Sequence, residues 1–171
     1  VFPYISIWFH YSLTADLIVV GSKTRHEFDL EQMKKSLALQ PVRQGLKRID
    51  VSTPYDFFEF FLIGNDDARG FLTGADINTD NRPILEFSLP KAQYTHTYGS
   101  TERVEKILQK VTNIFPPVKM PSSKTEKEEF YLKTGTVYRK DSFREAQTRK
   151  VFEKLLDLNP DNDPAKAYLN R

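Results

Sequence analysis

The sequence of 171 residues lacks cysteine altogether. It therefore has no disulfide, no thiolate nucleophile and no cysteine-ligated metal, and this absence fits a reducing compartment such as the cytoplasm. Its three histidines, His10, His26 and His96, are scattered, and none has a second histidine or a carboxylate at ligand spacing. Gly21-Ser22-Lys23 lacks the earlier glycine that a phosphate loop needs. The sequence thus predicts no metal site, no phosphate loop and no Ser–His–Asp arrangement.

Neither sign of charge dominates, since 25 basic residues stand against 23 acidic ones for a net charge of +2. This balance does not favour nucleic acid or an anionic membrane as a partner. The longest apolar runs, such as Phe57 to Ile63, are far shorter than the ~20 residues that a membrane helix needs. We therefore expect no nucleic-acid partner and no membrane segment in this chain. The chain opens on Val1-Phe2-Pro3, and we expect it to be a piece of a longer protein.

Aromatic rings are plentiful by contrast, with thirteen Phe and eight Tyr against one Trp. With 39% hydrophobic residues the chain can bury a core, and we expect that core to be built from rings. Residues 4–9 and 16–20 predict two strands whose short link favours an antiparallel hairpin. The second strand is almost purely apolar, as expected for a strand buried on both faces. Such strands require a larger sheet, which the sequence does not obviously supply.

Helical signals cover most of the remaining chain, so we expect an α+β fold that is mostly helical. Asp29 caps the first predicted helix, and Thr53-Pro54 starts a second one that would run to Ile63 before Gly64. Further elements are expected as helices over residues 65–72, 101–115, 126–138 and 142–158, and as a strand over residues 84–89. Residues 116–125 are rich in Pro, Ser and Lys, which predicts a linker.

A polar cluster in the middle of the chain begins like a calcium-binding loop. Asp76, Asn78 and Asp80 alternate as the first ligands of such a loop do. The pattern then fails, because Asn81 stands where glycine makes the sharp turn and Phe87 occupies the twelfth position. The spacing therefore disfavours calcium.

The same cluster has two other interpretations. Its candidate residues for a ligand-facing loop are Asn78, Thr79, Asp80, Arg82 and Glu86. In the alternative, Arg82 and the neighbouring carboxylates form a structural clasp, and paired charges are often structural. Turns made by the Asn and Asp side chains would stiffen the loop in both cases.

The C-terminal helices carry a spacing that is similar to the second half of a tetratricopeptide repeat. The residues that carry it are Gly135, Tyr138, Phe152, Leu155, Leu156 and Pro160. The match departs from the pattern, because Gly135 to Pro160 is one residue too long and Ala146 lies two residues too far from Phe152. An ordinary helical hairpin is the alternative. If the pair binds a protein partner, the candidate contact residues are Tyr138, Phe143 and Phe152.

Residues 1–98 resemble the C-terminal part of spermidine synthase-like proteins of a bacterial group in which this domain often follows a membrane-spanning region. Three segments carry the resemblance. Val1-Phe2-Pro3 with Ile7-Trp8 resembles the sixth strand of the family, and Asp16 to Ser22 resembles the seventh. Asn78-Thr79-Asp80-Asn81-Arg82-Pro83 through Leu85-Glu86-Phe87 resembles the closing motif, which usually has Asp where Asn81 stands.

The resemblance implies a Rossmann-like methyltransferase fold whose last two strands form an antiparallel hairpin at the sheet edge. It also implies transfer of an aminopropyl group from decarboxylated S-adenosylmethionine to a polyamine. In the family the nucleotide-binding turn and the catalytic carboxylates lie upstream of these strands, so no catalytic residue and no cofactor is expected in this chain. Asp80 and Glu86 would help to attract a polycationic amine, with Arg82 holding them.

Together these observations predict a non-catalytic C-terminal fragment of a spermidine synthase-like protein. It would consist of that domain part over residues 1–115, the linker over 116–125 and a tetratricopeptide-like helical hairpin over 126–171. The alternative is a protein-interaction module on an inactive scaffold. A hairpin without its own sheet also predicts a homodimer by edge pairing. We expect a cytoplasmic location, including the cytoplasmic part of a membrane-anchored parent.

Overall fold

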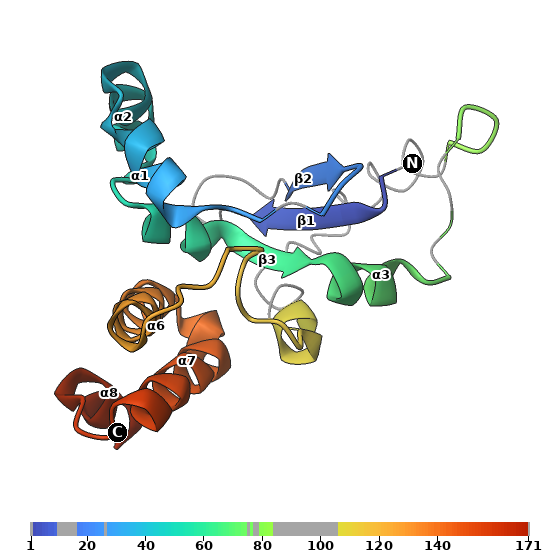
Figure 1. Cartoon of the computed structure of the whole chain (residues 1–171). Helices are drawn as coiled ribbons and strands as arrows, with labels where there is room; N and C mark the ends of the chain where they lie inside the picture. Colours follow the sequence, from blue (N-terminus) through green and yellow to red (C-terminus); the bar gives the residue numbers. More distant parts are fainter. Residues whose placement is uncertain are drawn as a thin grey trace.

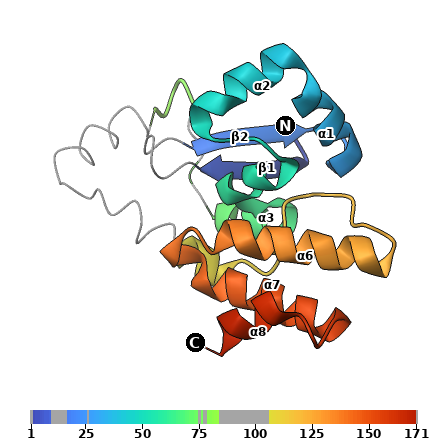
Figure 2. The same cartoon turned by 90° about the vertical axis from the view of Figure 1, so that its left-hand side faces the viewer.

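The computed structural model describes residues 2–9, 17–25, 27–74, 76, 79–83 and 106–170. The fold is α+β and mostly helical, with one three-stranded antiparallel sheet among the described residues. The sheet lies between two groups of helices, with α1 and α2 on one side and α6, α7 and α8 on the other (Figures 1 and 2). None of the helices in these ranges has the length and apolar content that a membrane crossing requires.

The sheet is built around β1 (Tyr4–Phe9), which pairs with β2 (Leu17–Ser22) on one side and β3 (Phe61–Gly64) on the other. Both pairings are antiparallel, and Ile7 lies opposite Val19 in β2 and Ile63 in β3. The predicted hairpin of the first two strands is therefore confirmed. Its link, residues 10–16, lies outside the described residues.

The third strand corrects the helix predicted over residues 54–63. The start signal holds, because Asp56 accepts the N–H groups of Ser52 and Thr53 at 3.0 and 2.7 Å in a capping box. The helix is a 3₁₀ helix, η2 (Pro54–Phe60), and it ends where Phe61 becomes extended. Phe61, Leu62 and Ile63 then pair with β1 and are each 2% exposed. Burial against the sheet outweighs the helical continuation that the start signal suggests.

α1 (Leu30–Ala38) begins at Asp29, whose carboxylate accepts the N–H groups of Glu31 and Gln32. α2 (Gln40–Leu46) follows at once and continues into η1 (Lys47–Ile49). α3 (Asn65–Leu72) leads directly out of β3, as the sequence predicts. Residues 106–110 are helical, which agrees with the described part of the helix predicted over 101–115. The predicted strand over 84–89 lies outside the described residues.

The C-terminal helices are α6 (Lys124–Tyr138), α7 (Glu145–Leu158) and α8 (Asp163–Leu169), with the short η3 (Ser142–Arg144) before α7. α6 and α7 form the predicted helical pair. Their contact depends on Gly135, because a Cβ at this position would lie 2.7 Å from Cε1 of Phe152. Phe152 is itself packed against Tyr168 of α8, with 5.0 Å between ring centroids.

One hydrophobic core crosses the predicted linker. Tyr55 and Phe58 of η2 pack against Phe130 of α6, with 5.9 Å between the rings of Phe58 and Phe130. Val118, inside the interval 116–125, belongs to the same core. Its neighbours are hydrogen-bonded to the strand-like segment before α1, since Phe28 N–H donates to Pro117 O and Lys119 N–H donates to Phe28 O. The interval is therefore anchored to the first part of the chain.

A buried arginine joins α7 to the sheet. Arg144 is 2% exposed and donates to the carbonyl oxygens of Glu59 and Phe61 at 2.8 and 2.7 Å. It pairs with Asp141 at 3.5 Å and lies over the ring of Tyr138. Burial lowers the pKa of Arg144 and raises the pKa of Tyr138 to about 12. In both cases burial disfavours the charged form of the side chain.

Candidate binding surface

The central polar cluster forms a tight turn on the surface. Thr79 and Arg82 exchange backbone hydrogen bonds, and the Thr79 hydroxyl accepts the N–H of Arg82 at 3.1 Å. The guanidinium of Arg82 pairs with Asp76 at 3.1 Å, so its ionic partner in the described residues is Asp76. Both side chains are more than 60% exposed, and such a pair contributes at most about 1 kcal/mol. Asn78 and Glu86 lie outside the described residues.

The described turn contains only part of the predicted ligand-facing loop. Thr79, Asp80 and Arg82 are exposed, and the hydrogen bonds of the turn agree with the clasp interpretation. Within the ranges that the structure covers, no three His, Cys, Asp or Glu side chains gather in a group that would hold a metal ion.

The three candidate contact residues of the C-terminal helices differ in accessibility. Tyr138 is fully buried, and its hydroxyl donates to the Ile114 carbonyl at 2.7 Å. Phe152 is 1% exposed. Both side chains build the core, so a partner cannot reach them in this conformation. Phe143 is half-buried and packs beside the core next to the sheet, and its role in partner binding stays a prediction.

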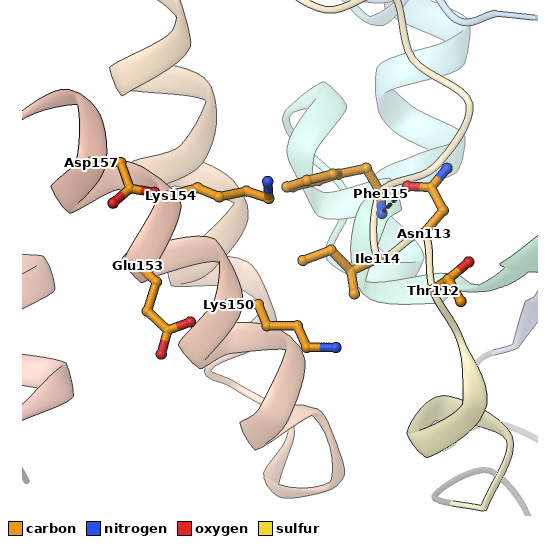
Figure 3. A pocket seen from close by; sticks show the side chains of 8 residues that line it. All are labelled: Thr112, Asn113, Ile114, Phe115, Lys150, Glu153, Lys154 and Asp157. Atoms are coloured by element: carbon orange, nitrogen blue, oxygen red, sulfur yellow. Dashed lines mark hydrogen bonds between the residues drawn. The ribbon is translucent and has the colours of Figure 1, made fainter.

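A polar groove lies between α7 and the segment 112–115, with a cavity volume of about 500 Å³ (Figure 3). Lys150 and Lys154 reach from α7 toward this segment, whereas Glu153 and Asp157 turn away from it. All four of these charged side chains are exposed to solvent. It offers two ammonium groups on a solvated helix face.

The opposite wall of the polar groove is fixed by Asp67 of α3. Its carboxylate accepts the Thr112 hydroxyl at 2.6 Å and the N–H groups of Thr112 and Asn113 at 3.1 and 2.9 Å. Burial alone would raise the pKa of Asp67, but these hydrogen bonds outweigh it and lower the pKa. Asp67 thereby attaches the segment after residues 106–110 to α3.

A second concave surface of the described residues is apolar and has a larger volume than the polar groove. It lies between the β1–β2 face of the sheet and the α1–α2 pair and has a cavity volume of about 810 Å³. We call it the β2 groove, and its apolar lining includes Trp8, Ile18, Val20, Met33, Leu46 and Phe60. Trp8 is one of its lining residues and packs edge-on against Phe28 and Phe61, with ring centroids 5.7 and 5.3 Å away.

β2 borders this groove and is exposed along its whole apolar stretch. Leu17, Ile18, Val19 and Val20 are 50, 66, 62 and 39% exposed. Ile18 and Val20 line the groove, while Leu17 and Val19 alternate onto the opposite face. Among the strands that the structure describes, β2 pairs only with β1, and no described strand lies along its other edge. The β2 edge and the β2 groove together form the strongest candidate binding surface.

The sequence gives part of this surface in advance. The apolar run at 17–20 indicates a strand that needs cover on both faces. The groove itself is not predictable from the pattern, because its walls come from segments distant in sequence, β1, α1, α2 and η2. The change from η2 to β3 places Phe60 and Phe61 at the sheet, and the helix prediction misses it.

Comparison with known proteins adds no relative to this picture: no protein-family model, no curated protein and no solved structure matches the chain.

Proposed function

We propose that this chain is the non-catalytic C-terminal part of a spermidine synthase-like protein. The parent would transfer an aminopropyl group from decarboxylated S-adenosylmethionine to a polyamine. This part would complete the sheet and the hydrophobic core of the parent domain, with the parent supplying the nucleotide site and the catalytic carboxylates. We place the domain in the cytoplasm, including the case of a membrane-anchored parent.

One observation supports the proposal: β2 is apolar on both faces, and within the described residues no strand pairs with its second edge. Strands of this composition belong to sheets that are covered on both sides, as in α/β enzymes. The antiparallel pairing of β1 with β2 also agrees with the hairpin that the resemblance implies. In an isolated protein an exposed apolar strand edge promotes pairing with other chains and aggregation.

One feature departs from the resemblance. The family hairpin is expected at the edge of its sheet, whereas β3 adds a further strand beside β1. β3 is four residues long and leads directly into α3. On this proposal it caps the edge of the parent sheet, since short edge strands limit unwanted pairing.

A thermal-shift titration tests the proposal. Methylthioadenosine, putrescine and spermidine would be added to this chain and to a longer chain that includes the preceding part of the gene product. Ligand binding raises the melting temperature with ligand concentration, so weak binding registers at high concentration. We expect the longer chain to respond and this chain alone to stay unchanged. A longer chain that responds to none of the three compounds would overturn the proposal.

The second candidate is a protein-interaction module, in which the C-terminal helices bind a partner. The observation that favours it is the polar groove, where Lys150 and Lys154 face the segment 112–115 without an ionic partner in the described residues (Figure 3). A partner identified by crosslinking should then be lost when both lysines are changed to glutamate. The matched control is Lys124→Glu with Lys127→Glu at the start of α6, which leaves the groove intact.

A further inference from the structure

We infer that the polar groove between α7 and residues 112–115 is a docking site for an extended acidic segment of another protein. Two carboxylates of that segment, at alternate positions, would pair with Lys150 and Lys154, which reach across the groove (Figure 3). The inference rests on the second candidate function and deepens it, since it names the chemistry of the partner that the C-terminal helices would bind.

The two groove lysines lack the carboxylate partner that another lysine of the C-terminal helices has. Lys133 of α6 pairs with Glu129 at 2.6 Å. Glu153 and Asp157 are the acidic neighbours of the groove lysines on α7, and both turn away from the groove (Figure 3). Within the described residues, the groove therefore presents two positive charges that are not paired with a carboxylate.

The two ammonium groups also repel each other. Lys150 and Lys154 are four residues apart in α7, so they share one face of the helix. Like charges at this spacing destabilise a helix. Two bound carboxylates would remove this repulsion, which gives the groove a preference for a ligand with two negative charges.

The spacing of the lysines selects an extended peptide. Four residues of an α-helix rise by about 6 Å. In an extended peptide, side chains at alternate positions point to the same side and repeat about every 6.6–6.8 Å. Carboxylates at alternate positions therefore match the two lysines, whereas adjacent carboxylates point to opposite sides of the peptide.

The wall opposite α7 is fixed within the folded chain. Asp67 accepts the backbone N–H groups of Thr112 and Asn113 at 3.1 and 2.9 Å. The Tyr138 hydroxyl donates to the carbonyl oxygen of Ile114 at 2.7 Å. A wall that is already ordered loses little conformational entropy when a ligand binds, so a short peptide can bind measurably.

The two longer stretches outside the described residues do not supply this acidic pair. Residues 10–16 contain a single carboxylate side chain. Residues 84–105 contain three, and no two of them stand at alternate positions: Glu86, Glu102 and Glu105. The sequence therefore favours a segment of another molecule as the source of the pair.

A second copy of this chain fits the groove less well than an extended segment does. Asp161 and Asp163 stand at alternate positions. Asp163 is the first residue of α8, and Asp161 already pairs with Lys166 at 3.0 Å. This pair is therefore neither extended nor free of a cation.

The acidic side chains of α7 favour a peptide over a nucleic acid. A nucleic acid carries a negative charge on every phosphate along its backbone. Glu153 and Asp157 lie beside the groove lysines on the same helix and would repel the neighbouring phosphates. A peptide with only two carboxylates avoids this repulsion.

Two capped peptides of equal charge test the spacing. Calorimetric titration would compare acetyl-Ala-Glu-Val-Glu-Ala-amide with acetyl-Ala-Glu-Glu-Val-Ala-amide, whose carboxylates are adjacent. We expect the alternating peptide to bind at least about fivefold more tightly. It should shift the NMR amide signals of Thr112, Asn113 and Phe115, and added salt should weaken it. Equal affinities of the two peptides, or shifts confined to other residues, would overturn the inference.

Lysine variants test the site. Lys150→Gln with Lys154→Gln should weaken the alternating peptide by at least about tenfold. The control, Lys124→Gln with Lys127→Gln at the start of α6, should bind it unchanged. Circular dichroism confirms that each variant is folded. An unchanged affinity of the groove variant would place the peptide elsewhere and overturn the inference.

A charge reversal adds a gain of binding that a merely structural role would not produce. Lys150→Glu with Lys154→Glu should bind acetyl-Ala-Lys-Val-Lys-Ala-amide, which the unsubstituted chain should not bind. Failure of the reversed variant to bind this peptide, although folded, would count against direct pairing in the groove.

Two other occupants have distinct outcomes. A mass that doubles with protein concentration, but stays single in the glutamine variant of the groove, would assign the groove to a second copy. An oligothymidylate that binds more tightly than the alternating peptide, and is lost in the same variant, would assign it to a nucleic acid. Either result would overturn the inference.

These outcomes separate the inference from the proposed function. A crosslinked partner that depends on both lysines, in a chain that binds neither acidic peptide, would keep the interaction module and reject the acidic segment. Lysine-dependent binding of the alternating peptide would stand whether or not the thermal-shift titration supports the spermidine synthase-like proposal.

Discussion

At the scale of single residues, Arg144 connects parts of the core that are distant in sequence. Its guanidinium holds two carbonyl oxygens at the junction of η2 and β3, while its backbone stands at the start of α7. A planar group with several donors suits this position better than an ammonium group does. The helical pair is thus attached to the sheet by hydrogen bonds as well as by apolar contact.

Arg144→Met should lower the free energy of unfolding by about 3–5 kcal/mol, because it leaves the Asp141 carboxylate and two carbonyls buried without their cation. Arg144→Lys should lose less, since it keeps the charge. Denaturant unfolding measures both changes. Arg149→Met, on the exposed face of α7, is the control and should change stability little. A small loss for Arg144→Met would show that the hydrogen bonds and the ion pair of Arg144 are dispensable for stability.

Asp67 should make stability depend on acid pH. Its pKa is lowered in the folded chain from an ordinary value of 3.8. Its stabilising contribution is therefore fully present above that value and is lost as the pH falls through the lower folded pKa. The difference in unfolding free energy between the unsubstituted chain and Asp67→Asn should thus be largest near neutral pH and shrink in acid. Asp80→Asn, on the exposed turn, is the control. A difference that stays constant with pH would refute the assignment.

Local chemistry explains which residue-level predictions succeed. The capping role of Asp29 and the capping box of Thr53 with Asp56 follow from short-range spacing and are found in the structure. The burial of Tyr138 depends on how segments distant in sequence meet, which spacing alone does not encode. Sequence reasoning therefore placed Tyr138 and Phe152 at a binding face although both lie in the core.

At the scale of elements, the contact between α6 and α7 depends on a glycine that lies within a helix and not in a turn. Gly135 is helical, and its only visible role is to admit the ring of Phe152. Alanine would favour the helix by about 1 kcal/mol on propensity alone. The contact has to be strong enough to outweigh that preference.

Gly135→Ala should therefore destabilise the chain by about 1–3 kcal/mol, because the new methyl group meets a buried ring that cannot move aside. Gly45→Ala in α2 is the matched control, since no atom lies within 4 Å of its Cβ position. The control should be neutral or slightly stabilising. Thermal melts of the two variants provide the test, and equal melting temperatures would contradict the packing argument.

Element prediction fails at β3 for a definable reason. The run Phe57 to Ile63 is apolar except for Glu59, and periodicity cannot separate a buried strand from a buried helix in such a short run. Pro54 and its cap favour a helix at the start, and pairing with β1 decides the end. The strand at β2 was easier to recognise, because Gly21 bounds its apolar residues.

At the scale of the whole molecule, one hydrophobic core of the described residues includes side chains from both sides of the linker predicted at 116–125. Phe58 and Leu30 from the first part share a cluster with Phe130 and Val151 from the last. Composition alone marks the interval as a linker, since Pro, Ser and Lys are typical of one. The hydrogen bonds between Phe28 and its neighbours across this interval are not visible in the sequence.

The two parts should consequently unfold together. Trp8, the single tryptophan, lies in the sheet and reports on the first part. Far-ultraviolet circular dichroism is dominated by the helices. The two signals should give one coincident transition, and Phe130→Ala should shift both by a loss of about 3–5 kcal/mol. Separate transitions, with only the helical signal shifted by the variant, would restore two independent domains.

The order of these elements along the chain has a consequence for synthesis. Phe58 leaves the ribosome before its partners Phe130 and Val151, and at about 5–20 residues per second the gap of roughly 70–90 residues takes about 4–18 s. During that time β1 and β2 are already made, yet the core that η2 forms with α6 and α7 cannot close. The apolar edge of β2 is then the first stretch available to a chaperone, and we expect the nascent chain to depend on one even though the finished fold does not.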